Sequence, residues 1–156
     1  MAEIRYDMLK EEAIRFLDAQ SYLVLATSSS NRVTARTISC VNKGLAIYFQ
    51  TDTNFLKSKQ IEQNPNVALC AANVQIEGIA KTRNHPFDVS NAEFLELFKK
   101  KHALAFNTYA HLKNQIVIEV EPKFITFWKY IDNKPLRDYL YVEKAKAQRE
   151  YYDISH

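Results

Sequence analysis

The chain has 156 residues and a mass of 18.1 kDa, which fits one domain with a hydrophobic core of its own. Apolar residues make up 47% of the sequence and charged residues 25%, so the disordered and collagen-like classes are excluded. Only two residues are glycine, which excludes a glycine-rich phosphate loop or a dinucleotide-binding fingerprint. The net charge of +3 is too small to indicate a nucleic-acid partner, but it suits a small anionic ligand.

We expect a cytoplasmic protein without a membrane span. No apolar run approaches the roughly 18 residues that a spanning helix needs, and the first residues are charged rather than arranged as a signal peptide. Cys40 and Cys70 lie in apolar, strand-like runs without zinc-ligand spacing. We therefore expect both to be buried free thiols in a reducing compartment.

Residues 3–20 are predicted to form an amphipathic helix, because Leu9, Ala13, Phe16 and Leu17 recur at helical spacing. After this helix the apolar period changes to two, which indicates short strands. Turns are expected at 28–31 and at 42–44, where Gly44 is free to take a positive φ. The predicted strands are 21–28, 32–41, 45–51, 66–73, 74–82, 115–121 and 124–131.

Three further helices are predicted. One begins near Asp52-Thr53-Asn54 and ends at about Glu62, because the residue before Pro65 avoids helical backbone. Another follows Ser90-Asn91-Ala92-Glu93, which fits a capping box. The charged segment 138–152 is also predicted to be helical, within a C-terminal helical tail over about 135–156.

The strands are linked by hairpin-length turns and show no βαβ rhythm, which predicts an antiparallel sheet. A closed sheet has no exposed edge, so we expect a small barrel over about 21–131 with flanking helices. The expected organisation is mainly β, in a single domain over 1–156.

No catalytic residue is identified from the pattern. The four histidines, His85, His102, His111 and His156, lack metal-ligand spacing and are expected on the surface or in loops, so no metal site is predicted. There is also no serine elbow.

One segment does indicate a ligand. Arg36 lies in mid-strand between apolar neighbours, and Lys57 lies in the first turn of a predicted helix, where a cation opposes the helix dipole. An anion bound by Arg36, Lys57, the Thr51 and Thr53 hydroxyls and the first-turn N–H groups would explain both placements. The alternative is that Lys57 is solvated and Arg36 pairs with a glutamate, and the pattern alone leaves both open.

Several segments, taken in order, resemble the pyridoxamine 5′-phosphate oxidase-like, FMN-binding split-barrel family over about residues 10–130. The most specific features are the spacing of six from Thr51 to Lys57 and the stretch Gln60-Ile61-x-x-Asn64-Pro65. The other matching segments are 36–39, 44 with 47–51, 67–69 and 76–78. The resemblance implies a six-stranded antiparallel split β-barrel, FMN as the cofactor, and a homodimer with FMN at the subunit interface.

The resemblance also implies a set of cofactor-binding residues. Arg36 and Lys57 match the family's basic phosphate-binding positions, which favours the anion interpretation. Gln50 and Thr51 match the strand-end pair that contacts the cofactor, and Thr53 follows them in the same loop.

Further positions are expected to lie near the flavin ring. Thr37, Ile38 and Ser39 match the strand whose backbone runs beside the ring. Asn73 falls where oxidase members have a glutamine that reaches the cofactor. Trp128 lies near the last barrel strand, where some members lend an aromatic side chain to the partner's flavin; a core tryptophan is the alternative.

The sequence also departs from the family's pattern. Val41 and Leu56 stand where oxidases often have basic residues, and the C-terminal arginine–histidine substrate signature is missing, with Arg137 the only nearby arginine. We therefore expect an FMN-dependent oxidoreductase that is not a true pyridoxamine phosphate oxidase. It would transfer hydride or electrons between a reduced nicotinamide-type donor such as NAD(P)H and a small organic acceptor.

Two alternatives belong to other classes. The protein could be a non-catalytic flavin-binding or stress-associated protein. It could instead be a haem-binding relative on the same barrel, for which His85 is the only loop candidate near the barrel.

Overall fold

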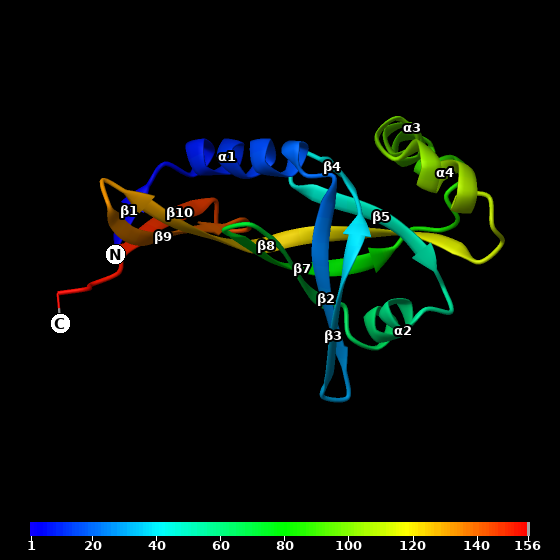
Figure 1. Ribbon diagram of the computed structural model, residues 1–156, viewed down its shortest axis with the longest axis horizontal. Coiled ribbons are helices and arrows are strands. Elements are labelled where there is room, and N and C mark those ends of the chain that lie inside the picture. The colour runs from blue at the N-terminus through cyan, green and yellow to red at the C-terminus, as the bar shows by residue number, and fades with distance from the viewer. Residues whose placement is uncertain (156) are drawn as a thin grey trace.

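The structure is a computed structural model that describes residues 1–155. Its strands belong to one antiparallel sheet, and helices lie along the sheet and at its ends (Figure 1). The strands are β1 Ala2–Ile4, β2 Tyr22–Ser29, β3 Arg32–Ser39, β4 Val41–Lys43, β5 Ala46–Asp52, β6 Asn66–Ala71, β7 Val74–Thr82, β8 Gln115–Ile131, β9 Lys134–Tyr141 and β10 Lys146–Tyr151. The helices are α1 Tyr6–Ala19, α2 Leu56–Gln63, α3 Ala92–Lys101 and α4 Ala103–Tyr109, with a 3-10 turn, η1, at Val89–Asn91.

The sheet curls into a barrel that stays open along one side. Strand order is β1-β10-β9-β8-β7-β6-β2-β3, and β5 pairs with β8 and with the short β4. β3 is not hydrogen-bonded to β5, so β2, β3, β5, β6, β7 and β8 form a six-stranded split barrel. The prediction of a mainly β, antiparallel split barrel with peripheral helices is confirmed.

Alternating apolar side chains fill the barrel. They come mainly from β2, β5, β7 and β8, and α1 adds the apolar face that its spacing predicted. The most deeply buried are Leu23, Leu25, Ile47, Phe49, Leu69, Ile76, Ile118 and Ile125. Residues Ala2–Ile4 form β1 against β10 instead, so the first two residues of the helix predicted over 3–20 belong to a strand.

β8 is one continuous strand, where two were predicted. It spans the length of the molecule, pairing with β5 and β7 in its first part and with β9 in its second (Figure 1). The expected break at Pro122 is a β-bulge, where Gly78 pairs with Pro122 and Glu77 pairs with Phe124. A Cβ at Gly78 would lie 2.8 Å from the Glu121 carbonyl oxygen, so the close approach at this bulge requires glycine.

The predicted C-terminal helix is wrong. Residues 134–151 form the β9–β10 hairpin, in which Leu136, Asp138 and Leu140 point to the covered face. Asp138 is a fully buried carboxylate bonded to Arg149 and Lys129, and its polarity hides the alternating pattern of β9. His156, the end of the predicted tail, lies outside the described residues.

Two helix starts also differ from the prediction. α2 begins at Leu56 rather than near Asp52, because Asp52 Oδ1 accepts the Asn54 N–H in a turn before the helix. Ser90 does not cap α3; it lies in η1, where the Asp88 side chain accepts its N–H. Within residues 1–155, no helix has the length and apolar character that a membrane crossing requires.

Candidate anion and cofactor site

The candidate site lies where α2 meets β2 and β3. Arg36 is on β3, directly opposite Leu25 of β2, and its half-buried side chain points toward this end of the barrel. The site therefore combines a strand residue with the first turn of a helix that is distant in sequence.

The Arg36 guanidinium is held only by neutral acceptors. Its Nη1 donates to Thr27 Oγ1 at 2.7 Å and to the Leu25 carbonyl oxygen at 3.3 Å, and its Nη2 donates to Thr34 Oγ1. No acidic side chain pairs with it among the residues that the structure describes, so the expected alternative, an Arg36–glutamate pair, is not formed. Burial without a counter-charge lowers the pKa of Arg36.

Gln60 completes the surroundings of Arg36 and was not among the predicted site residues. Its side chain is 1% exposed. Gln60 Oε1 accepts hydrogen bonds from Thr27 at 2.6 Å and Thr34 at 2.7 Å, and Gln60 Nε2 donates to the Arg32 carbonyl oxygen at 3.0 Å. The only signal in the sequence was its place in the Gln60-Ile61 segment, which gave no role for the side chain.

Lys57 adds a second unpaired cation. It is half-buried in the first turn of α2, with its Nζ 4.8 Å from the centre of the Phe55 ring. Burial lowers the pKa of Lys57, the charge of Arg36 lowers it further, and Asp52 offsets part of the shift. Lys57 is therefore not the freely solvated lysine that the second interpretation required.

The start of α2 supplies further donors. No side chain caps this end of the helix, and its first turn contains no acidic residue. The first-turn N–H groups and the helix dipole therefore act in the same direction as Lys57 and Arg36. Together these groups favour an anion at this position.

The strand end at Gln50 and Thr51 holds two unsatisfied polar atoms. Thr51 is 4% exposed, and neither Thr51 Oγ1 nor Gln50 Oε1 has a hydrogen-bond partner. A buried polar atom without a partner costs about 1–3 kcal/mol, so such atoms often mark the place of a ligand. Because neighbouring strand residues point to opposite faces, Thr51 faces the barrel interior while Gln50 lies opposite Val117 on the face that α3 covers.

The other predicted residues of this region have different placements. Thr53 is exposed in the loop between β5 and α2, where its N–H donates to the Asn114 carbonyl oxygen. Thr37 is exposed, Ile38 is in the core and Ser39 is partly buried, all on β3. Since β3 pairs only with β2, its second backbone edge is free to meet a flat ligand.

Asn73 and Trp128 form a separate group. Asn73 lies in the tight β6–β7 turn and donates from Nδ2 to the Trp128 carbonyl oxygen at 2.8 Å. Trp128 is half-buried, with the Arg137 guanidinium 4.8 Å from its ring centre. In the described part of the chain, no hydrogen bond or ring contact joins this group to Arg36 or Lys57.

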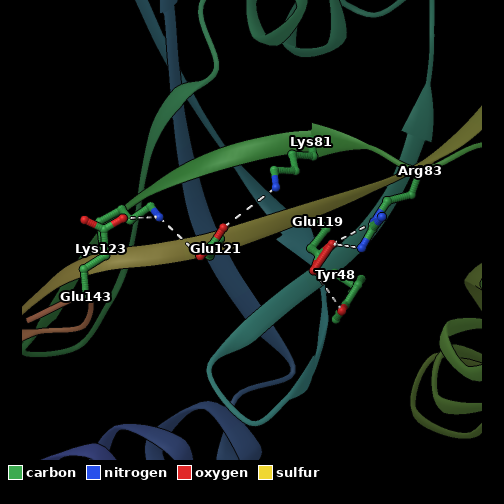
Figure 2. Close-up of polar contacts among 7 residues, drawn as sticks. All are labelled: Tyr48, Lys81, Arg83, Glu119, Glu121, Lys123 and Glu143. Carbon is green, nitrogen blue, oxygen red and sulfur yellow. Dashed lines mark hydrogen bonds and ion pairs between the residues drawn. The ribbon is translucent and has the colours of Figure 1, made fainter. Parts of the chain in front are cut away.

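Three other cations of the barrel, Lys81, Arg83 and Lys123, are already neutralised. A row of opposite charges crosses β5, β8 and β7 and continues toward the β9–β10 loop (Figure 2). The Glu119 carboxylate accepts hydrogen bonds from the Arg83 guanidinium and from the Tyr48 hydroxyl. Burial raises the pKa of Tyr48, and the negative charge of Glu119 raises it further. The pairs are Arg83–Glu119 at 2.6 Å, Tyr48–Glu119 at 3.1 Å, Lys81–Glu121 at 3.9 Å, Lys123–Glu121 at 3.2 Å and Lys123–Glu143 at 2.9 Å.

The three histidines that the structure describes, His85, His102 and His111, do not form a metal site. His85 Nδ1 accepts the Phe87 N–H at 3.0 Å, so its Nε2 carries the proton and donates to the Leu112 carbonyl oxygen at 2.8 Å. His102, expected on the surface or in a loop, is instead buried between α3 and α4 and bonds to the Cys40 carbonyl oxygen. No group of potential metal ligands gathers anywhere in residues 1–155.

The two cysteines differ in environment. Cys40 is buried as predicted, and burial raises its pKa to about 11. Cys70 is exposed, which contradicts the prediction, because it lies on the outward face of β6 opposite Val24.

The sequence profile of one family, described as pyridoxamine 5′-phosphate oxidase, matches residues 9–129. The chain belongs to this family. The matched residues include the candidate site and the split barrel except for the last two residues of β8, as the resemblance predicted. No curated protein matches the chain.

Solved structures agree with this assignment. A pyridoxamine 5′-phosphate oxidase-related, FMN binding protein from Nostoc punctiforme is 17% identical with a TM-score of 0.62, and the match covers 94% of this chain and 95% of that one. General Stress Protein 26 from Bacillus anthracis is 20% identical with a TM-score of 0.63, covering 76% and 92%. HutZ, the heme storage protein from Vibrio cholerae, is 12% identical with a TM-score of 0.60, covering 76% and 91%. At these identities the likeness establishes the fold alone.

Proposed function

We propose that this protein binds FMN and uses it as an oxidoreductase. The observation that carries the proposal is the pair of half-buried cations, Arg36 and Lys57, which lie close together and form no ion pair with a carboxylate within residues 1–155, although Asp52 acts on Lys57 from a longer distance. The unsatisfied hydroxyl of Thr51 nearby along the chain adds a polar group that a ligand can satisfy. A phosphate monoester suits this set because it brings negative charge and several acceptor oxygens.

The residues present fit FMN in the following way. Arg36, Lys57, the first-turn N–H groups of α2 and the Thr51 hydroxyl would hold the phosphate. The free edge of β3, at Thr37–Ser39, would lie beside the flavin ring. Bound FMN would supply the hydride and electron transfer, while these side chains bind and orient it.

The reaction partners follow from the chemistry of a flavin. A reduced nicotinamide such as NAD(P)H is the proposed donor, and a small organic molecule is the proposed acceptor. A non-catalytic, flavin-sequestering protein is the alternative, and the likeness to a general stress protein is consistent with it. Consumption of NADH or NADPH by the FMN-loaded protein, measured by absorbance with an artificial acceptor, separates the two.

We also propose that the working form is a homodimer. The outward face of β2 and β3 carries Tyr22, Val24 and Val33, which are 57%, 37% and 71% exposed in one chain. A second copy on this face would cover these side chains and the exposed edge of β3. In this proposal Trp128 of the second copy would lie near the cofactor and cover the flavin ring, which would otherwise be open to solvent.

A haem-binding function is less well supported. The Vibrio cholerae protein is described as a heme storage protein, and a haem iron needs an axial ligand. Both ring nitrogens of His85, the histidine expected to serve, are engaged in hydrogen bonds.

The test of the proposal is cofactor binding by the purified protein. Fluorescence titration should give a much smaller Kd for FMN than for riboflavin, because the phosphate supplies much of the binding. Equal Kd values would contradict the phosphate site. A haem spectrum after titration with hemin, without binding of FMN, would make the haem alternative the correct one.

A further inference from the structure

We name the Thr27, Thr34 and Gln60 side chains the neutral cluster. The directions of their hydrogen bonds determine which of their atoms can accept a hydrogen bond from Arg36. Gln60 Nε2 donates to the Arg32 carbonyl oxygen, which fixes the amide so that Oε1 faces the two threonines. Each threonine has one hydroxyl proton, and Gln60 Oε1 accepts both of these protons. The lone pairs of both hydroxyls are therefore left to accept from Arg36.

Two N–H groups of Arg36 are used neither by the neutral cluster nor by the Leu25 carbonyl oxygen. A guanidinium has five N–H groups, and three of them are used by Thr27, Thr34 and the Leu25 carbonyl oxygen. The remaining two are Nε–H and one N–H of Nη2. Within the described residues neither has a partner, and a pair of this kind points outward along one edge of the planar guanidinium and matches two oxygens of a phosphate.

The neutrality of the cluster matters as much as its geometry. Thr27 is 2% exposed, Gln60 is 1% exposed and Thr34 is half-buried, so the chain buries two polar side chains and part of a third where apolar ones would fill the same space. A carboxylate here would hold Arg36 equally well but would cancel its charge. A neutral cluster fixes the guanidinium and keeps the positive charge available to a ligand.

We infer that the neutral cluster determines specificity for a phosphorylated flavin, by holding Arg36 so that its Nε–H and Nη2–H groups bind two phosphate oxygens. The inference rests on the proposed function and extends it to three residues that would not touch the cofactor. Thr27, Thr34 and Gln60 are thus positioning residues, and they should affect the phosphate but not the ring.

The experiment compares Kd values for FMN and for riboflavin in matched variants. Thr34→Val keeps the shape and removes the hydroxyl, while Thr34→Ser keeps the hydroxyl. We expect Thr34→Val to weaken FMN binding about tenfold, corresponding to one hydrogen bond to a charged group. Riboflavin binding should not change, and Thr34→Ser should retain the parent's preference for FMN. Thr27→Val and Thr27→Ser form a second matched pair in case one site does not tolerate the change.

Gln60→Glu tests the charge of the neutral cluster separately from the positions of its hydrogen-bonding atoms. The carboxylate can still accept from both threonines, but it places a negative charge one hydroxyl away from Arg36. We expect it to reduce the preference for FMN more than Gln60→Leu does, with unchanged riboflavin binding as evidence that the fold is intact.

The outcomes separate the inference from the proposed function. If the parent protein shows no preference for FMN over riboflavin, the proposed function itself fails. If the parent prefers FMN but both valine variants keep the full preference, the role of the neutral cluster is overturned. The role is also overturned if the valine variants weaken FMN and riboflavin equally, because that pattern reports a general loss of structure.

Discussion

Two half-buried cations that form no ion pair within the described residues, such as Arg36 and Lys57, destabilise the protein that contains them unless a ligand offsets their charge. Arg36 and Lys57 each have a lowered pKa because burial disfavours the charged form, and Arg36 adds repulsion at Lys57. The site would thus be maintained at some expense of stability in the absence of cofactor. Removing the charge of either residue should then weaken FMN binding and stabilise the cofactor-free protein.

We predict this opposition for Lys57→Met, which keeps the stem and removes the charge. FMN binding should weaken by about 1.5–3 kcal/mol, roughly 10- to 150-fold, while the Tm of the cofactor-free protein rises. Titration and thermal unfolding measure the two effects. Lys59→Met is the control, because Lys59 is exposed on the same helix. A lower Tm together with unchanged FMN binding would contradict the assignment.

The pH dependence follows from the direction of the Lys57 shift. Because the folded pKa lies below the usual 10.5, the unfolded chain binds more protons between the two values. The destabilisation by charged Lys57 is therefore complete below the folded pKa and is lost as pH rises through it toward 10.5. The Tm advantage of Lys57→Met over the parent should shrink across that window, and an advantage that grew instead would contradict the shift.

At the level of elements, the barrel could be predicted from the sequence and the C-terminal hairpin could not. Apolar residues at every second position, such as Ile116, Ile118 and Val120, identify strands, and this strand segment was predicted correctly. In β9 the alternation is broken by Asp138, a charged residue at a core position. The ion partners that make this position possible, Lys129 and Arg149, lie on neighbouring strands, and no local pattern could identify them.

The candidate site shows the same limit. Arg36, Thr51 and Lys57 were found because cations and hydroxyls stand out locally in a strand and a first turn. Gln60 was missed because its role depends on two threonines of another hairpin. The separation of Trp128 from Arg36 depends on the sheet topology, which the sequence does not give.

The prediction for the β9–β10 hairpin concerns the buried carboxylate of Asp138. Burial alone would raise its pKa, but hydrogen bonds from Arg149 and Lys129 outweigh burial and lower the pKa. Its stabilising effect is therefore present above 3.8 and is lost as pH falls through the folded pKa. Asp138→Asn should cost about 3–5 kcal/mol at pH 7, because Arg149 loses its carboxylate.

Urea unfolding at pH 7 measures that cost, and its size should fall in acid. Asp132→Asn, in the exposed β8–β9 turn, is the control, since asparagine tolerates the positive φ of that position. Equal stability of Asp138→Asn and the parent would show that the buried carboxylate has no role in holding β9 to β10.

At the scale of the whole molecule, the proposed dimer predicts a change in cysteine reactivity. Val24 and Cys70 are opposite each other on the uncovered sheet face. Val24→Arg should give a monomer of about 18.1 kDa by light scattering and make Cys70 react quickly with a thiol reagent. Cys40 should stay unreactive because burial raises its pKa to about 11. Val89→Arg, away from the sheet face, is the control.

A monomeric parent protein, or a parent whose Cys70 reacts as fast as in Val24→Arg, would contradict the proposed interface. The FMN titration should also be repeated on the monomeric variant. If the partner contributes Trp128 to the cofactor, the monomer should bind FMN more weakly although Arg36 and Lys57 are unchanged.

The whole set of barrel cations leads to the last prediction, that the protein is a poor oxidase for pyridoxine or pyridoxamine 5′-phosphate. That reaction needs a second phosphate site with cations of its own, because an unpaired phosphate is costly to bury. Apart from Arg36, Lys57 and the exposed Arg32, Lys134 and Lys146, the basic residues on barrel strands and the adjoining hairpin are engaged. Arg83 and Lys81 pair with glutamates of β8, Lys129 with Asp138, and Arg137 with the face of Trp128 (Figure 2 shows the first two).

Recruiting one of these cations for a substrate phosphate would remove a cation from a carboxylate, as Arg83 from Glu119, so the pocket should favour a less charged acceptor. The measurement is oxygen uptake by FMN-loaded protein with pyridoxine 5′-phosphate, against a blank of free FMN. We expect a rate no greater than the blank. Turnover of about 1 per second or faster, which is typical of enzymes on their own substrates, would require one of these ion pairs to open. In that case Arg83→Gln should lower the turnover without changing the Kd for FMN.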